Sequence, residues 1–378
     1  MTAPSAPTGA VPYDVFRERR HFPALDGLRA LSIAVVIWEH CRNRAVAWWS
    51  HGMNGVVLFF VLSGFLITSL CLREESKYRR VSLRAFATRR AFRILPLYYC
   101  VLGFYTLIVV VLGLDPRRPR FLHALPYYAL FLQEVPHFQF PNVPFEVAWS
   151  LGVEEKFYLL WPLVAFFLLA RIPRWRAPIA AGLALLAGLA PQLGPWGNYV
   201  FYEGAILWGC VVAMLLHDEA VYERVRWIGR SGVVAAALLL AVAVHMLTQN
   251  DNRAAANIVL PMTFAVAIGA LVTTQARWTR VFDARPLAAV GIASYVIYLI
   301  HQLFLKVAEK AIPARFGVAG DIATLLLGAG LAIGASLLIH RWFEEPVTAI
   351  GRRLSRAIED RTPAGARAPA ATRVERAT

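Results

Sequence analysis

The chain has 378 residues, of which 58% are apolar and only 17% are charged. Soluble domains carry about 25% charged residues and disordered chains are poor in apolar ones, so both classes are excluded and we predict a protein embedded in a lipid bilayer. The formal charge of +15 would favour nucleic-acid binding in a soluble protein, but cytoplasmic loops of membrane proteins also collect lysine and arginine, and we predict no nucleic-acid partner.

Ten apolar runs follow one another along the chain and predict an all-α bundle of about ten transmembrane helices. A helix needs about 20 residues to cross the hydrocarbon, so the shorter runs require polar ends or a thinner bilayer. The segment 122–132 is too short to span and is predicted to be interfacial or re-entrant. The predicted spans are 25–45, 55–72, 95–114, 157–169, 179–193, 199–216, 233–247, 257–274, 287–307 and 322–342.

Basic residues are distributed unevenly between the loops. With the N-terminus in the cytoplasm, 28 lie on the cytoplasmic side and 8 outside, which predicts that both termini are cytoplasmic. We expect a multi-pass protein of the inner (plasma) membrane with a cytoplasmic arm over 1–24, a membrane domain over 25–346 and a basic, disordered tail over 347–378. The four cysteines lack metal-ligand spacing and predict no disulfide framework, and no metal is expected.

The first predicted helix carries Arg29 and His40, eleven residues apart. At 100° per residue this is three turns plus 20°, so both side chains point the same way, about 16 Å apart along the axis. Ionisable groups in the bilayer are costly and tend to face the bundle interior or a cavity. The alternative is that Arg29 reaches the inner headgroups while His40 caps the outer interface.

The next two helices carry small and basic residues. Ser63 and Gly64 in the second run favour close helix packing. Arg90 and Arg93 stand three residues apart just before the third run, where two guanidinium groups can clamp a phosphate by bidentate hydrogen bonds. The ordinary basic flank of a membrane helix explains the same two arginines equally well.

Polar residues also mark the fourth and ninth predicted spans. The segment 149–158 places Glu154 and Glu155 at the mouth of the fourth span. A carboxylate there can share a proton with an imidazole, or it can simply suit the start of a helix. His301 lies in the ninth span and is either functional or a packed, hydrogen-bonded interior histidine.

These segments, taken together and in order, resemble the membrane-bound acyltransferase family 3. The resemblance extends over roughly 22–346, nearly the whole chain outside its tails. It implies a ten-helix bundle that moves acyl groups from acyl-coenzyme A onto carbohydrates or other hydroxyl acceptors. The blocks that carry it are 25–30 with the following His40, 59–65, 90–96, 149–158, 294–301 and 344–346.

The resemblance also implies a role for individual residues. It makes His40 the essential imidazole, either as the general base for the acceptor hydroxyl or as a carrier of the acyl group. We add Arg29 and Glu154 to the catalytic group, and Glu154 can orient or charge-balance the imidazole or bind the sugar. Acyl-CoA is anionic and confined to the cytoplasm, so we expect it to enter from the basic inner face and to be bound by Arg90, Arg93, Arg29 and Ser63. The predicted acceptor-binding residues are Trp149, Tyr158 and His301.

We therefore predict an integral-membrane O-acyltransferase. It would move an acetyl or other short acyl group from acyl-CoA, in the first place acetyl-CoA, to a hydroxyl of a cell-envelope carbohydrate such as lipopolysaccharide, or of a glycolipid. Acyl-CoA is expected as a donor substrate, with no permanently bound cofactor. The alternative is a transporter or flippase for a lipid-linked sugar or acylated product, in which His40, Glu154 and His301 relay protons. The acyl group, the acceptor and the oligomeric state stay open.

Overall fold

The computed structural model describes residues 9–19, 21–40, 52–140, 142–194, 197–248 and 253–360. Within these ranges the regular structure is helical, apart from one isolated antiparallel bridge between Ala10 and Thr274. The all-α prediction is thereby confirmed for the described part of the chain.

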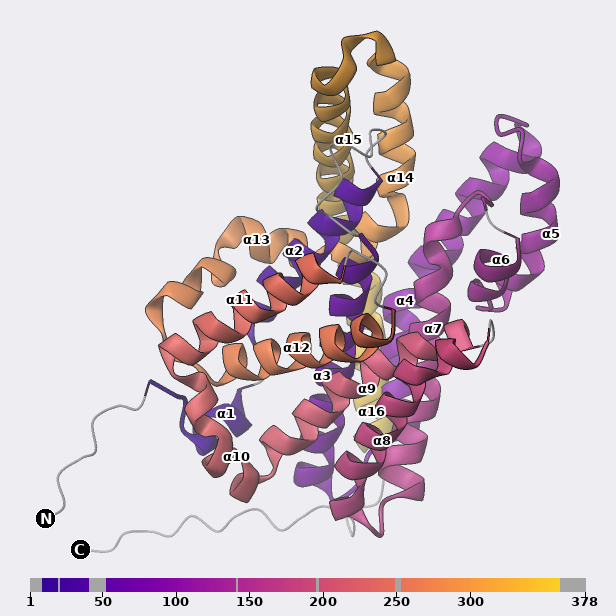
Figure 1. Ribbon diagram of the computed structural model, residues 1–378. Coiled ribbons are helices and arrows are strands. Elements are labelled where there is room, and N and C mark those ends of the chain that lie inside the picture. The colour runs from indigo at the N-terminus through magenta and orange to yellow at the C-terminus, as the bar shows by residue number, and fades with distance from the viewer. Residues whose placement is uncertain are drawn as a thin grey trace, which may run out of the picture.

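Figure 1 shows the order of the helices, with α14 and α15 standing side by side at one end of the molecule. Short helical turns join or extend them: η2 (Glu146–Ala148) leads into α7, η3 (Val164–Leu168) extends α7, and η9 (His340–Glu344) joins α15 to α16. The α-helices are α1 Tyr13–Glu18, α2 Pro23–Glu39, α3 Gly52–Tyr78, α4 Leu83–Thr106, α5 Arg118–Ala129, α6 Glu134–Gln139, α7 Trp149–Leu163, α8 Arg176–Leu189, α9 Gly197–His217, α10 Glu219–Val225, α11 Ser231–Leu247, α12 Arg253–Thr273, α13 Arg285–Ile292, α14 Ser294–Ala311, α15 Gly317–Ile339 and α16 Glu345–Asp360.

The number of membrane spans differs from the sequence-based prediction. In the described ranges six helical segments are long and apolar enough to cross a membrane, and the count rises to eight if each of two bent helix pairs forms one span. The bent pairs are α10 with α11, at 82°, and α13 with α14, at 80°. The prediction of about ten spans is therefore not confirmed. The six segments are Gly52–Tyr78, Leu83–Val111, Pro173–Leu193, Val200–His217, Ala256–Thr273 and Gly317–Glu359.

The first and fourth predicted spans are the ones that fall short, each for a physical reason. Helix α2 has 17 residues and ends at Glu39, fewer than the roughly 20 that cross the hydrocarbon, and 41–51 lie outside the described residues. Helix α7 has 15 residues and carries Glu154, Glu155 and Lys156 in its middle. Both helices carry charged side chains where a membrane span would carry apolar ones. Both helices also line the candidate site described below.

Helices α3 and α9 pack closely in the centre of the bundle. A Cβ atom on Gly64 would lie 1.9 Å from the carbonyl oxygen of Ile206, and one on Gly209 would lie 2.0 Å from that of Val61. Only glycine lets the two backbones approach this closely, which is how small residues bring membrane helices together. The packing role predicted for Gly64 is confirmed, and α3 is thereby held rigidly beside the site.

The C-terminal part of the described chain is a helix that lies against α4. Helices α15 and α16 are continuous through η9, and α16 packs along α4. Arg89 of α4 forms ion pairs with Glu74 of α3, at 2.9 Å, and with Glu359 of α16. The tail predicted to be disordered from residue 347 is therefore helical as far as Asp360, where it packs on α4 and pairs with Arg89 through Glu359; 361–378 lie outside the described residues.

Candidate functional site

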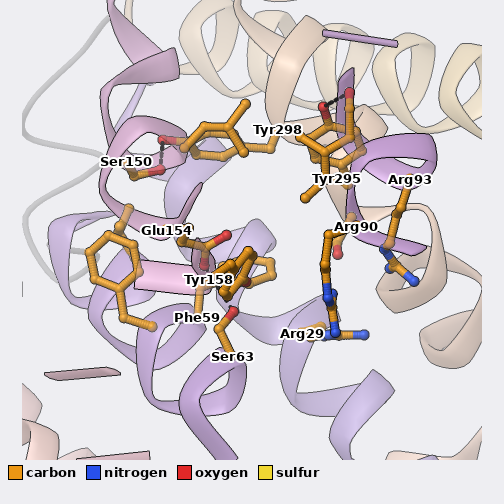
Figure 2. A pocket seen from close by; sticks show the side chains of 15 residues that line it. Arg29, Phe59, Ser63, Arg90, Arg93, Ser150, Glu154, Tyr158, Tyr295 and Tyr298 are labelled. Carbon is orange, nitrogen blue, oxygen red and sulfur yellow. Dashed lines mark hydrogen bonds between the residues drawn. The ribbon is translucent and has the colours of Figure 1, made fainter. Parts of the chain in front are cut away.

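Five helices surround a pocket that we name the arginine pocket. It holds about 720 Å³ of space not filled by atoms, part of which is open to solvent. Figure 2 shows its three arginine side chains on one side, with Ser63, Glu154 and Tyr158 facing them. The lining residues are Arg29 from α2; Val56, Phe59, Phe60 and Ser63 from α3; Arg90, Arg93 and Ile94 from α4; Ser150, Leu151, Glu154 and Tyr158 from α7; and Ser294, Tyr295 and Tyr298 from α14.

Arg29 is positioned by Asp26, one turn earlier on α2. One carboxylate oxygen of Asp26 lies 3.7 Å from the Arg29 guanidinium, and the other lies 2.7 Å from Nε2 of His21. Asp26 is buried, and its backbone touches α13 at Gly291, where a Cβ atom would meet the Asp26 carbonyl oxygen at 1.9 Å. This tight contact fixes the start of α2 and, with it, the side from which Arg29 enters the pocket.

The neighbouring arginines Arg89, Arg90 and Arg93 of α4 have different surroundings. Arg89 forms the ion pairs with Glu74 of α3 and Glu359 of α16. The Arg90 guanidinium lies over the rings of Phe86 and Tyr158, at 5.7 and 5.2 Å from their centroids. Within the described residues neither Arg90 nor Arg93 forms an ion pair with a carboxylate, and both line the pocket. Their positive charge is therefore directed at the pocket, where guanidinium forks suit phosphate oxygens.

Glu154 faces the arginines across the same pocket. Its carboxylate accepts a hydrogen bond from the Ser63 hydroxyl at 2.8 Å, and Figure 2 shows the two side chains together beside Tyr158. His40 lines a different pocket. The structure thus brings Glu154 to Ser63 and the arginines, and separates it from the imidazole that it was predicted to orient.

The second pocket, which we name the histidine pocket, lies at the other end of α2. It holds about 790 Å³ of space not filled by atoms. Residues from α2, α3, α6, η2, α7 and α14 line it. The pocket therefore lies between the start of α3 and the segment that leads into α7. The lining residues are Val36, Glu39, His40, Gly52, Met53, Val56, His137, Glu146, Val147, Trp149, Tyr298 and Gln302.

His40 is the residue that caps the C-terminal end of α2. Its Nδ1 lies 2.8 Å from the carbonyl oxygen of Val36, and a carbonyl only accepts, so Nδ1 carries the proton and Nε2 carries the lone pair. The ring of His301 stands edge-on to that of His40, with centroids 4.9 Å apart. His301 is fully buried, and its Nδ1 donates to the Tyr298 carbonyl at 2.8 Å, which supports the interpretation of His301 as a packed interior histidine.

A second imidazole, from the loop region before α7, lines the histidine pocket. His137 of α6 lies with Nδ1 3.0 Å from a carboxylate oxygen of Glu146 in η2. Its ring stacks on Trp149, with centroids 4.9 Å apart and planes 12° apart. Because the carboxylate accepts, Nδ1 of His137 is the protonated nitrogen. The pocket therefore brings together two imidazoles whose orientation is fixed by hydrogen bonds.

The two pockets meet at Tyr298 and Val56, which line both. The Tyr298 hydroxyl accepts a hydrogen bond from Ser150 at 2.8 Å and donates one to the carbonyl oxygen of Val147. The Ser150 bond is visible in Figure 2. One aromatic side chain, tied to the start of α7 from two directions, thus stands at the boundary between the arginine pocket and the histidine pocket.

The nine residues predicted from the sequence fall into these two places. His40 and Trp149 line the histidine pocket, and His301 packs against His40. Sequence reasoning missed Ser150, Tyr298, His137 and Glu146. The first two lie inside the segments 149–158 and 294–301, so a signal was present, whereas no local pattern distinguishes the last two. The residues at the arginine pocket are Arg29, Ser63, Arg90, Arg93, Glu154 and Tyr158.

The chain is similar in sequence to known O-acetyltransferases. The chain is 29% identical over 356 residues to an O-acetyltransferase OatA of Staphylococcus aureus, an alignment that covers 87% of this chain and 57% of that protein. It is 26% identical over 310 residues to a peptidoglycan O-acetyltransferase OatA of Listeria monocytogenes, covering 75% of this chain and 49% of that protein. The chain thus spans about half the length of these curated relatives. No solved structure matches it.

A family model also matches most of the chain. The model described as "Acyltransferase domain" covers residues 22–341, which include every residue of the arginine and histidine pockets. The resemblance found in the sequence blocks is confirmed. This chain belongs to the membrane acyltransferase family defined by that domain.

Proposed function

We propose that this protein is a multi-pass O-acyltransferase of the inner (plasma) membrane, which moves an acetyl or other short acyl group from acyl-CoA to a hydroxyl of a cell-envelope carbohydrate. The observation that carries the proposal is the junction of two pockets, one lined by three arginines and the other by histidines, at Tyr298 and Val56. A polyanionic donor and a neutral sugar acceptor need these two different environments.

The arginine pocket would bind the donor. Coenzyme A carries phosphates, and Arg90 and Arg93 offer guanidinium forks without competing carboxylate ion pairs in the described chain. The uneven distribution of basic residues predicts that the start of α4 lies in the cytoplasm, where acyl-CoA is confined. Arg29 would add a third positive charge. Glu154, held by Ser63, would accept hydrogen bonds from the amides of the pantetheine arm.

The histidine pocket would hold the acceptor and the reacting carbonyl. Nε2 of His40 carries the lone pair, so it can attack the thioester and carry the acyl group or take the proton of the acceptor hydroxyl. Trp149 is 4% exposed and stacks on His137, so it would act on the acceptor by holding that ring in place. The name of the Listeria relative, a peptidoglycan O-acetyltransferase, makes a peptidoglycan glycan the first acceptor to examine.

The test is transfer of radiolabelled acetyl from acetyl-CoA to glycan fragments by purified protein in detergent, where no ion or substrate gradient exists. An enzyme transfers label under these conditions. A transporter or flippase that uses His40, Glu154 and His301 as a proton relay does not, and would require sealed vesicles for any activity. Absence of transfer in detergent together with substrate movement in vesicles would replace the enzymatic proposal.

A further inference from the structure

We propose that His137, oriented by Glu146, is the general base that takes the proton from the acceptor hydroxyl, a role distinct from that of His40. This inference rests on the proposed acyltransferase function and divides its chemistry between two imidazoles. It assigns His40 to the acyl group and His137 to the acceptor.

The geometry around His137 fixes the ring in two directions. The hydrogen bond from Nδ1 to Glu146, at 3.0 Å, acts in the plane of the ring, and the stacking on Trp149 acts on its face. A carboxylate that accepts from Nδ1 leaves the lone pair on Nε2 and stabilises the imidazolium that forms when Nε2 takes a proton. This is the arrangement of a general base with its orienting carboxylate.

The position of His137 and Glu146 favours a contact with the acceptor over a purely structural role. His137 and Glu146 both line the histidine pocket, which also contains His40. Their side chains are 19% and 32% exposed, so a substrate in the pocket can reach them. Neither residue lines the arginine pocket, where the donor phosphates would be bound.

The chemistry requires a second base if His40 carries the acyl group. In the first step Nε2 of His40 attacks the thioester carbonyl, the carbon–sulfur bond breaks, and the coenzyme A thiolate leaves with the electron pair. The product is an acyl-imidazolium whose Nδ1 keeps its proton and donates it in the hydrogen bond to the Val36 carbonyl oxygen. The lone pair of Nε2 is then in the new bond, so His40 has no means to deprotonate the acceptor.

His137 completes the second step. Its Nε2 takes the proton of the acceptor hydroxyl as the oxygen attacks the acyl carbon, and the carbon–nitrogen bond to His40 breaks. His40 returns to its neutral form with the proton on Nδ1, and the His137 imidazolium releases its proton to solvent. The sum is thioester plus alcohol giving ester, thiolate and one proton.

The experiment separates the two steps in the purified full-length protein. Acetyl-CoA is the donor, glycan strands released from peptidoglycan are the acceptor, and free coenzyme A is measured by chromatography. Without acceptor, the wild type and His137→Gln should each release a burst of about one coenzyme A per protein. With acceptor, His137→Gln should transfer at least roughly 10²-fold more slowly, as expected for a missing general base.

Two further variants distinguish a base from a structural residue. Free imidazole should partly restore transfer to His137→Ala, since it can occupy the vacated space beside Glu146. Glu146→Gln keeps a hydrogen-bond acceptor for Nδ1 but removes the charge, so kcat for transfer should fall with little change in the KM for the acceptor. His340→Gln is the matched control, because His340 forms a similar pair with Glu344, at 2.7 Å, outside both pockets.

The outcomes are separable. Transfer by His137→Gln at the wild-type rate, or loss of the coenzyme A burst together with transfer in that variant, overturns the assignment of His137 to the acceptor step. An equal loss in His340→Gln also overturns it. A wild type that neither releases coenzyme A nor transfers acetyl overturns the proposed function itself, and this inference with it.

Discussion

The hydroxyl of Ser150 donates a hydrogen bond to the hydroxyl of Tyr298 at 2.8 Å, at the place where the arginine pocket and the histidine pocket meet. The Tyr298 hydroxyl in turn donates a hydrogen bond to the carbonyl oxygen of Val147, the residue that follows Glu146 in the chain. The bonds of one hydroxyl therefore connect the helix that carries His301 to the segment that carries the proposed acceptor-side residues.

Tyr298→Phe should keep the ring between the pockets but lose both hydrogen bonds. Each such bond contributes on the order of 1 kcal/mol, and the start of α7 would lose its tie to α14. We expect a lower Tm and a several-fold slower acetyl transfer, with unchanged acetyl-CoA affinity. Tyr98→Phe is the matched control, since the Tyr98 hydroxyl also makes two hydrogen bonds, to the Tyr128 carbonyl at 2.8 Å and from the Gln133 amide at 2.7 Å, and Tyr98 lines neither pocket. Equal effects on transfer in both variants would argue against a special position of Tyr298.

Lysine should replace Arg90 and Arg93 poorly. A lysine supplies the charge but not the planar fork that gives paired hydrogen bonds to a phosphate. The Arg90→Lys, Arg93→Lys double variant should bind acetyl-CoA more weakly in an equilibrium binding measurement. Arg89→Lys is the matched control on the same helix, because Arg89 pairs with Glu74 and Glu359 instead. It should reduce thermal stability and leave donor affinity intact. Wild-type affinity for acetyl-CoA in the double variant would mean that both arginines are ordinary basic residues flanking a membrane helix.

His40→Ala should abolish acetyl transfer, with a loss of at least roughly 10²-fold in rate. Donor binding should survive, because the arginines belong to a different pocket from His40. The coenzyme A burst should disappear in this variant, in contrast to His137→Gln. Measuring binding and transfer on the same preparation checks the prediction, and near-normal transfer would falsify a chemical role for His40.

The topology predicted from the basic residues is open to a direct test. Cysteines introduced singly at Arg79 and Arg118, in a chain whose four native cysteines are replaced, should react differently with a membrane-impermeant reagent. Residue 118 should be labelled in intact cells and residue 79 only after permeabilisation, since the loop around Arg79 is predicted to be cytoplasmic. The reverse pattern would place both termini outside.

Local features of the sequence were sufficient for part of this description. Apolar runs and basic flanks predicted a helical membrane protein, because hydropathy acts on each segment alone. Six of the nine candidate residues chosen from the sequence lie at the arginine pocket, although the sequence did not predict that they share it. The blocks of sequence were also sufficient to recognise the acyltransferase family, which the family match confirms.

Other features were decided by tertiary structure, because they depend on contacts between distant segments. No periodicity reveals that His137 and Tyr298 come to the same pocket as His40, nor that Glu154 turns to Ser63 and away from that pocket. Helix α16 is stabilised by its packing on α4 and by the ion pair between Arg89 and Glu359, which are 270 residues apart in the chain. The basic, polar sequence of this segment does not predict that it forms a helix. Helix α2 is shorter than a membrane span and helix α7 carries three charged residues, and only the structure shows that both helices line the two pockets.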